Sequence, residues 1–187
     1  LDPGQEGAHL ALADALWRQH RAKDSLRAVQ AAAAALPDSI AIAARLGHVL
    51  LAEQNPVAAA EAFARAAAAP QAPADVWLGL TDALWRAGRV AEAAEAARRG
   101  IAAHPASADL LARLGQLLLA DGDAVAAQQA LAEAAASNPT SEAVHLAMAD
   151  ALWRQGRRAE AIPAARQAVA PRPGKPEVAA RPGHLLL

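Results

Sequence analysis

Residues 82–86 read Asp-Ala-Leu-Trp-Arg, and the same five residues recur at 14–18 and 150–154. Successive copies of this motif lie 68 residues apart. A second motif, Arg-x-Gly, recurs with the same spacing, and its copies begin at Arg45, Arg113 and Arg181. The two motifs belong to alternate units of 34 residues. A period of this length is the signature of a repeat architecture, in which small similar units stack on one another.

The units align with one another without a gap. The odd units are 6–39, 74–107 and 142–175, the even units are 40–73 and 108–141, and a partial unit covers 176–187. Positions 7 and 11 of the units carry large apolar residues, one helical turn apart. Position 7 is Leu12, Leu46, Leu80, Leu114 or Met148, and position 11 is Leu16, Leu50, Leu84, Leu118 or Leu152. This stripe predicts a first helix that packs through one face.

Small residues recur at positions 8, 20 and 27 of the units. Position 8 reads Ala13, Gly47, Thr81, Gly115, Ala149 and Gly183, and position 27 reads Ala32, Ala66, Gly100, Ala134 and Ala168. Position 20 reads Ser25, Ala59, Ala93, Ala127 and Ala161. Because a small side chain lets two helices approach closely, these series predict tight packing between helices.

Helix breakers fall between these stripes. Position 15, where a short turn would join two helices, is Gly88, Gly122 or Gly156, and position 32, where the second helix should stop, is Pro37, Pro105, Pro139 or Pro173. Good helix formers fill the rest, with few β-branched or aromatic residues. The sequence therefore predicts an all-α chain of helix-turn-helix units. His20 and Gln54 replace the turn glycine, which predicts weaker turns in the first two units.

The C-terminal part departs from the pattern. Pro163 falls inside the second helix of the fifth unit and Pro182 inside a first helix, and an internal proline costs on the order of 3 kcal/mol. We expect this end to be kinked or irregular. The sequence begins at Leu1 and stops at Leu187, midway through a predicted first helix, so we expect a fragment of a longer protein.

The chain resembles a tandem array of tetratricopeptide repeats (TPR). Unit 108–141 carries the family signature at Leu111, Leu114, Gly115, Leu118, Gly122, Ala127, Leu131, Ala134 and Pro139. Unit 74–107 also has the family's tryptophan, Trp77, at position 4, where His9 and His145 stand in their units as expected partly buried structural residues. The resemblance implies a single α-solenoid over residues 1–187, wound as a right-handed superhelix.

Composition argues against several functions. The formal net charge is −1, which gives no bulk attraction to nucleic acid or anionic lipid, and no apolar run approaches the roughly 18 residues of a membrane span. There is no cysteine, the six histidines are dispersed, and neither a zinc-protease motif nor a glycine-rich phosphate loop is present. We expect no catalytic residue, no metal site and no cofactor.

Composition also bears on the source of the chain. Among the 18 Lys and Arg residues, the lysines are Lys23 and Lys175 alone, and the chain is rich in alanine. This bias is typical of a GC-rich bacterial gene. The compartment, cytoplasmic or periplasmic, stays open.

The resemblance implies that first helices line a concave groove in which an extended peptide or a partner-protein segment binds. The candidate groove residues are Asp14, Trp17, Arg18, Arg45, His48, Asp82, Trp85, Arg86, Arg113, Gln116, Asp150, Trp153 and Arg154. Trp and Arg dominate interface energetics, and a Trp removes about 150–250 Å² from water when covered.

Each of these residue types also has a purely structural interpretation. Asp82 and Arg86, like their counterparts in the other copies, are spaced for an i,i+4 pair worth about 0.2–0.5 kcal/mol. The aspartates could instead bridge adjacent units, as Asp14 with Arg45, Asp82 with Arg113 and Asp150 with Arg181. The tryptophans could lean on the first helix of the next unit.

The sequence favours a non-catalytic scaffold that binds a protein or peptide. TPR arrays that clamp a C-terminal carboxylate use Lys and Asn in the groove, and this chain lacks them there. One alternative is the recognition arm of a larger enzyme, such as a glycosyltransferase, and another is a periplasmic polysaccharide-export scaffold. Self-association through the Trp-bearing face or the last helix is a third outcome.

Overall fold

The computed structural model describes residues 3–169, which form ten α-helices and no strand. The helices are α1 Pro3–Arg18, α2 Ala22–Ala35, α3 Ile40–Ala52, α4 Pro56–Ala67, α5 Ala74–Arg86, α6 Val90–Ala103, α7 Ala108–Asp121, α8 Ala124–Ser137, α9 Glu142–Arg154 and α10 Arg158–Ala168. The predicted all-α class is confirmed. Within this range no helix has the length and apolarity needed to cross a membrane.

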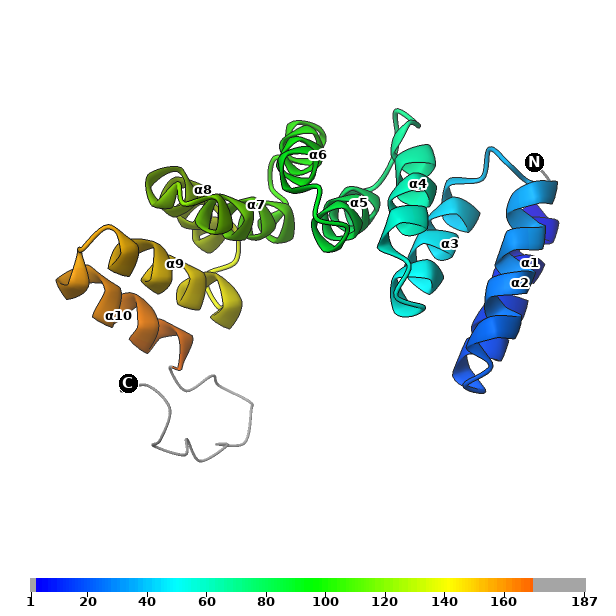
Figure 1. Cartoon of the computed structure of the whole chain (residues 1–187), viewed down its shortest axis with the longest axis horizontal. Helices are drawn as coiled ribbons and strands as arrows, with labels where there is room; N and C mark the ends of the chain where they lie inside the picture. The colour runs from blue at the N-terminus through cyan, green and yellow to red at the C-terminus, as the bar shows by residue number, and fades with distance from the viewer. Residues whose placement is uncertain (1–2, 170–187) are drawn as a thin grey trace.

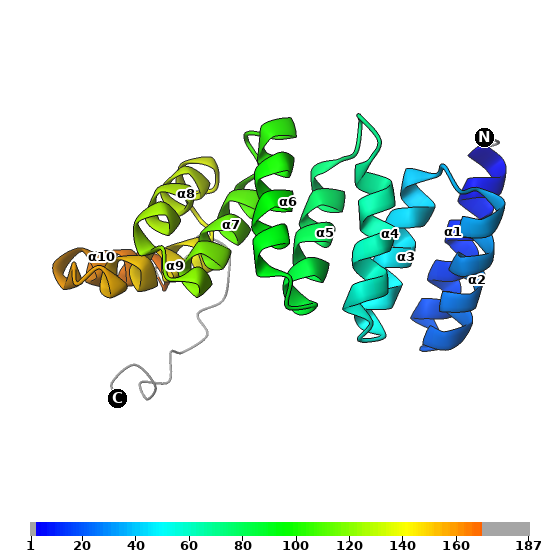
Figure 2. The same cartoon turned by 45° about the horizontal axis from the view of Figure 1, so that its top comes forward.

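Consecutive helices pack in pairs, and the pairs stand side by side in a curved row (Figure 1). Figure 2 shows the same row turned, with each pair beside the next from α1 and α2 to α9 and α10. Each first helix, from α1 to α7, also contacts the first helix of the following pair. Among the described helices, second helices of neighbouring pairs do not contact one another. The first helices therefore line the inner side of the curve and the second helices its outer side.

All five turns between paired helices close in the same way. The backbone N–H just after each turn donates to a carbonyl five residues earlier, as from Arg21 to Leu16 (3.0 Å) and from Arg89 to Leu84 (2.9 Å). Gly88 has the positive φ of 76° that this turn requires. His20 and Gln54 adopt the same left-handed conformation, with φ of 58° and 57°. The first two turns thus keep their geometry without glycine, at the cost of backbone strain.

The N-termini of the second helices are stabilised in two ways, which alternate along the chain. In the even units a side-chain oxygen of Asn55 or Asp123 accepts the N–H three residues later and caps the second helix. In the odd units an arginine stands at this position and pairs with an acid in the first helical turn. These pairs are Arg21–Asp24, Arg89–Glu92 and Arg157–Glu160.

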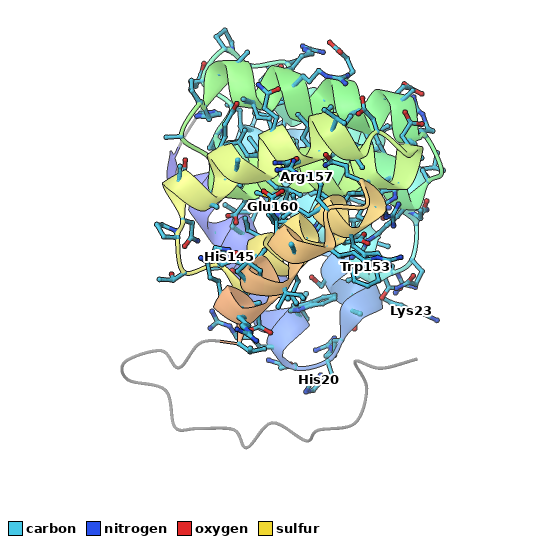
Figure 3. All side chains as sticks on the ribbon, turned by 90° about the vertical axis from the view of Figure 1, so that its left-hand side faces the viewer. His20, Lys23, His145, Trp153, Arg157 and Glu160 are labelled. Atoms are coloured by element: carbon cyan, nitrogen blue, oxygen red, sulfur yellow. The ribbon has the colours of Figure 1, made fainter. Side chains whose placement is uncertain are left out.

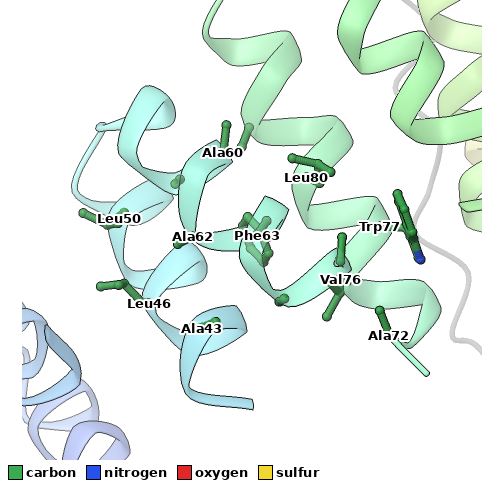
Figure 4. Packing of buried hydrophobic residues seen from close by; sticks show 14 of the residues in the cluster. Ala43, Leu46, Leu50, Ala60, Ala62, Phe63, Ala72, Val76, Trp77 and Leu80 are labelled. Atoms are coloured by element: carbon green, nitrogen blue, oxygen red, sulfur yellow. The ribbon is translucent and has the colours of Figure 1, made fainter. Parts of the chain in front are cut away.

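The core is built from bulky side chains set against glycine or alanine. The Phe63 ring of α4 packs against Gly47 of α3 and Gly79 of α5 (Figure 4), and a Cβ atom at Gly47 would lie 2.6 Å from the ring. Leu131 packs against Gly115 in the same manner, and Trp77 against Gly100. The small residues at positions 8 and 27 therefore leave the space that these large side chains fill.

The two ends of the array differ from its middle. Leu12 is 52% exposed, unlike Leu46 and Leu80 at 7% each, because no described helix pair precedes the first one. Helix α10 continues through Pro163 to Ala168, so this proline does not end the helix. Pro173, Pro182 and the partial unit 176–187 lie outside the described residues.

Candidate functional site

All thirteen candidate groove residues lie on first helices. Helix α1 carries Asp14, Trp17 and Arg18, α3 carries Arg45 and His48, α5 carries Asp82, Trp85 and Arg86, α7 carries Arg113 and Gln116, and α9 carries Asp150, Trp153 and Arg154. We call the surface formed by these thirteen residues the inner face. Hollows open on it at three of the junctions between successive helix pairs.

The hollow between α5 and α7 measures about 230 Å³ and is lined by Asp82, Trp85, Arg86 and Arg113. Arg113 comes from the repeat after the one that supplies the other three. Its Nε lies 2.6 Å from Asp82 Oδ1, and its Nη2 donates a hydrogen bond to Asp82 Oδ2 (3.2 Å). Its guanidinium carbon also lies 5.2 Å from the centroid of the Trp85 ring, within reach of a cation–π contact. Arg113 therefore ties the acid and the ring of one repeat to the next.

The ion pair in this hollow is partly withdrawn from water. Asp82 Oδ1 and Arg113 Nε are both buried, and their approach is a close charge contact without aligned hydrogen-bond geometry. Burial raises the pKa of Asp82 above its ordinary value, against the opposing effect of Arg113 and Arg86. The Arg113 guanidinium is further held by a 2.8 Å hydrogen bond from its Nη1 to Gln116 Oε1.

The hollow between α1 and α3 repeats this arrangement one 68-residue period earlier. It measures about 370 Å³ and is lined by Trp17, Arg45, His48 and Val49. Arg45 forms an ion pair with Asp14, as Arg113 does with Asp82. Trp17 is 39% exposed, so part of the ring faces this open space.

His48 sits at the edge of the same hollow. Its ring meets Phe63 edge-on with the centroids 4.9 Å apart. Burial and the nearby Arg45 charge lower the pKa of His48, and Asp75 opposes this shift. The surroundings of His48 therefore favour the neutral imidazole over the charged form.

The hollow between α7 and α9 is larger, about 420 Å³, and more apolar. Its lining is Gln116, Leu119, Ala120, Ala143, Leu146, Ala147, Asp150 and Arg154. Arg154 Nη1 donates a 2.6 Å hydrogen bond to the carbonyl of Leu119 in the last turn of α7. A cation is favourable there because helix C-termini carry partial negative charge. Arg154 also pairs with Asp150 at 3.1 Å.

Each repeated aspartate could pair with the arginine four residues on or with an arginine of the next repeat. Asp14 and Asp82 pair with the arginine of the next repeat, and neither forms an ion pair with the arginine four residues on. Asp150 does pair within its own helix. Its predicted partner Arg181, like His184, lies outside the described residues.

The third tryptophan is the most exposed of the repeated set. Trp153 is 55% exposed, and the Arg158 guanidinium of α10 lies 5.0 Å from its ring centroid. Figure 3 views the array from the end formed by α9 and α10 and labels Trp153 there. Trp85, which the next repeat covers in part, is by contrast only partly exposed.

The histidines outside the inner face have structural surroundings. His145 is 8% exposed, and its Nε2 lies 2.7 Å from the Pro139 carbonyl oxygen, while His9 is half-buried. His104 Nε2 lies 2.8 Å from the Ala72 carbonyl oxygen. Within residues 3–169 no three His, Asp or Glu side chains gather closely enough to hold a metal ion.

Family models described as tetratricopeptide repeat match three adjoining parts of the sequence, residues 10–73, 73–117 and 118–180. The chain belongs to the tetratricopeptide repeat family. The matched segments span both versions of the 34-residue unit, as the sequence predicts. The comparison with curated proteins finds no match.

Solved structures of bacterial TPR proteins share the fold. MamA is 20% identical, the match covers 83% of this chain and 91% of MamA, and the TM-score is 0.77. PilF of Pseudomonas aeruginosa is 19% identical over 91% of this chain and 79% of its own, with a TM-score of 0.73. YrrB, described as a TPR protein with an unusual peptide-binding site, is 15% identical over 86% and 83%, with a TM-score of 0.70. At these identities the likeness establishes the architecture.

Sequence reasoning missed several residues of these hollows. Val49 lies one position after His48 and lines the α1–α3 hollow, and Leu146 and Ala143 line the α7–α9 hollow. The alternation of the two unit types could have found Leu146, because an exposed leucine at position 5 faces the same groove as the tryptophans. The stacking of Arg158 on Trp153 depends on rotamers and had no signal in the sequence.

Proposed function

We propose that this TPR array is a non-catalytic scaffold that holds an extended segment of a partner protein along its inner face. TPR proteins are in general protein-interaction scaffolds, and the described residues supply such a face. The observation that carries the proposal is the position of the hollows. Each opens between the first helices of neighbouring repeats, so that one bound segment would cross several repeats.

The inner face offers two kinds of contact at regular intervals. Each odd repeat places one tryptophan on the inner face, namely Trp17, Trp85 or Trp153. A partner that covers one of these rings would remove a large apolar area from water. Arg18 and Arg86 form no ion pair with another residue of the range 3–169. Their guanidinium groups are free to donate to carboxylates or backbone carbonyls of a guest segment.

The proposal is tested by capturing partners from a bacterial lysate with the whole chain and with a Trp17→Ala, Trp85→Ala, Trp153→Ala variant. A matched control carries Val57→Ala, Val125→Ala and Ile162→Ala, which removes three exposed apolar side chains from second helices. We expect the tryptophan variant to lose a partner that the control retains. Equal capture by both variants would contradict binding at the inner face.

Single substitutions in the α5–α7 hollow separate structural from binding roles. Asp82→Ala removes the partly buried ion pair with Arg113, so we expect a lower melting temperature. Arg86→Ala removes a guanidinium without an ion pair, so we expect weaker partner binding at an unchanged melting temperature. If Arg86→Ala leaves the affinity intact, that arginine has no part in binding.

Two further possibilities are tested by separate observations. A nucleotide-sugar-binding catalytic domain beside the array in its parent gene would make the array the recognition arm of that enzyme. Self-association would show as a mass above 19.1 kDa by light scattering. The tryptophan variant would restore the monomer if the inner face were the contact.

A further inference from the structure

A separate hollow of about 330 Å³ opens on the outer side of the array, between the second helices α4 and α6. These two helices do not contact each other, and α5 lies between them as the floor. The apolar lining is Ala60, Ala64, Leu80, Leu84 and Ala96, and the charged lining is Glu61, Arg89, Glu92, Glu95 and Arg99. Arg89 pairs with Glu92, and the Arg99 guanidinium lies 5.0 Å from the centroid of the Trp77 ring. We call this hollow the outer furrow. Figure 4 labels two of the lining residues, Ala60 on α4 and Leu80 on α5.

The same junction occurs again 68 residues later, between α8 and α10, and there side chains bridge the space. Gln128 Oε1 accepts hydrogen bonds from Arg157 Nη1 (2.6 Å) and Gln155 Nε2 (3.0 Å). Gln155 Nε2 also donates to the Ala124 carbonyl (2.9 Å). In the outer furrow the counterparts of Gln128 and Gln155 are Ala60 and Ala87, which cannot form this network. One copy of the junction is bridged and the other is open.

The charged residues also differ between the copies. Glu61, Glu95 and Arg99 border the outer furrow, whereas the second copy has Gln129, Pro163 and Gln167 at these places. The pair that supports the turn is present in both, as Arg89–Glu92 and Arg157–Glu160 at 2.6 Å each. Figure 3 labels the second of these pairs. Stacking of repeats makes the same demands on both copies. Arg99 is accounted for by its contact with Trp77, whose counterpart in the second copy is His145, whereas the two carboxylates have no such contact to explain them.

We propose that the outer furrow binds a helix of another protein that presents a leucine- or methionine-sized side chain and, one turn away, a lysine or arginine. The alanine and leucine floor matches the apolar side chain. Glu61 on α4 and Glu95 on α6 stand on opposite walls. Neither forms a close ion pair within the described part of the chain, and the pKa of Arg89 is raised chiefly by its hydrogen bond to Glu92 and also by the Glu61 charge. The volume lies near the lower end of ligand pockets, about 300–1,000 Å³, which suits one or two side chains of a docked helix.

The probe is a synthetic amphipathic peptide with Leu and Arg one turn apart on one face, added to the isotopically labelled chain and followed by NMR. We expect the largest shifts at Leu80, Leu84 and Ala96. A peptide with Glu in place of Arg should bind at least tenfold more weakly. Shifts confined to the inner face, or equal binding of the two peptides, would overturn the proposal.

Two variants locate the contact. Glu61→Lys with Glu95→Lys reverses the charge of two exposed side chains, so the fold should be kept and the affinity should fall at least tenfold. Ala60→Gln with Ala87→Gln copies the bridged junction and should abolish the shifts at Leu80 and Leu84. Unchanged affinity in the charge variant would refute the site. The triple tryptophan variant should bind the peptide normally, which distinguishes this site from the proposed inner-face function.

Discussion

The two turns without glycine contain the clearest strain in the molecule. His20 and Gln54 hold φ values of 58° and 57°, a region that costs a side-chain-bearing residue about 1–2 kcal/mol. We expect His20→Gly and Gln54→Gly each to stabilise the chain, by up to about 1 kcal/mol once the greater chain entropy of glycine is subtracted. Urea unfolding measures the effect. Gly88→Ala is the opposite change and should destabilise, and a loss of stability in either glycine variant would show that the side chains compensate the strain.

The tryptophan beside Gly100 leaves no room for a larger residue at this position. A Cβ at Gly100 would lie 2.7 Å from Trp77 Cβ and 3.0 Å from a methyl of Leu110, both buried. We expect Gly100→Ala to destabilise by about 1–3 kcal/mol through overpacking. Gly7, on exposed α1, has no atom within 4 Å of such a Cβ, so Gly7→Ala should stabilise by up to about 1 kcal/mol. Thermal unfolding of the two variants compares the effects directly, and equal shifts would contradict the packing argument.

His48 gives the array a defined response to acid. Because its pKa is lowered in the folded chain, the unfolded chain binds the proton first as the pH falls below about 6.5. The free energy of unfolding should therefore decrease between about pH 7 and the lowered pKa. His48→Gln, which copies Gln116 of the equivalent position, should reduce this decrease in unfolding experiments at pH 7.5 and 5.5. An identical decrease in the variant would show that His48 does not contribute to it.

The residue patterns in the sequence predicted where small side chains stand but not what fills the space. Position 8 is small in every unit, yet its partner is Phe63 in one repeat and Leu131 in another. Such pairs are set by the rotamers and approach of two helices, which a one-dimensional pattern does not contain. The left-handed His20 was likewise predicted as a weak turn, because the turn hydrogen bond that outweighs its strain appears only in three dimensions.

At the scale of helices, the junction between α5 and α7 depends on a pair whose partners come from different repeats. Asp82 and Arg113 are 23% and 27% exposed, whereas Asp150 and Arg154, within α9, are both 47% exposed. A double-mutant cycle with alanine should give a coupling energy of about 0.5–3 kcal/mol for Asp82 and Arg113. For Asp150 and Arg154 it should stay below about 0.5 kcal/mol. A larger coupling in the exposed pair would reverse the assignment of the structural bridge.

The ion pairs between adjacent repeats could be predicted from the sequence, because the 68-residue period places Asp and Arg at fixed positions of adjacent units. Two of those predicted pairs form. The hydrogen bond from Arg154 to the Leu119 carbonyl could not be predicted from the sequence, since it depends on the angle between α7 and α9. Period and helix type were thus predictable, and the contacts that a helix crossing angle decides were not.

At the scale of the whole molecule, the curvature places the repeated motif on one side. Among the ten described helices, first helices contact one another along the row and second helices do not. The repeated tryptophans and arginines of α1, α5 and α9 therefore share the inner side. The resemblance to TPR arrays predicted this arrangement. The difference between the two outer junctions was not predicted, because it appears only when open space is compared between copies of one repeat.

The central claim is that a partner lies along the inner face. A photo-crosslinking residue in place of Leu146, which is 46% exposed in the α7–α9 hollow, tests it against the same residue in place of Val125, which is 69% exposed on α8. With the partner captured by the whole chain, we expect crosslinks from position 146 and none from position 125. Crosslinks from position 125 alone would place the partner on the second helices and contradict the account.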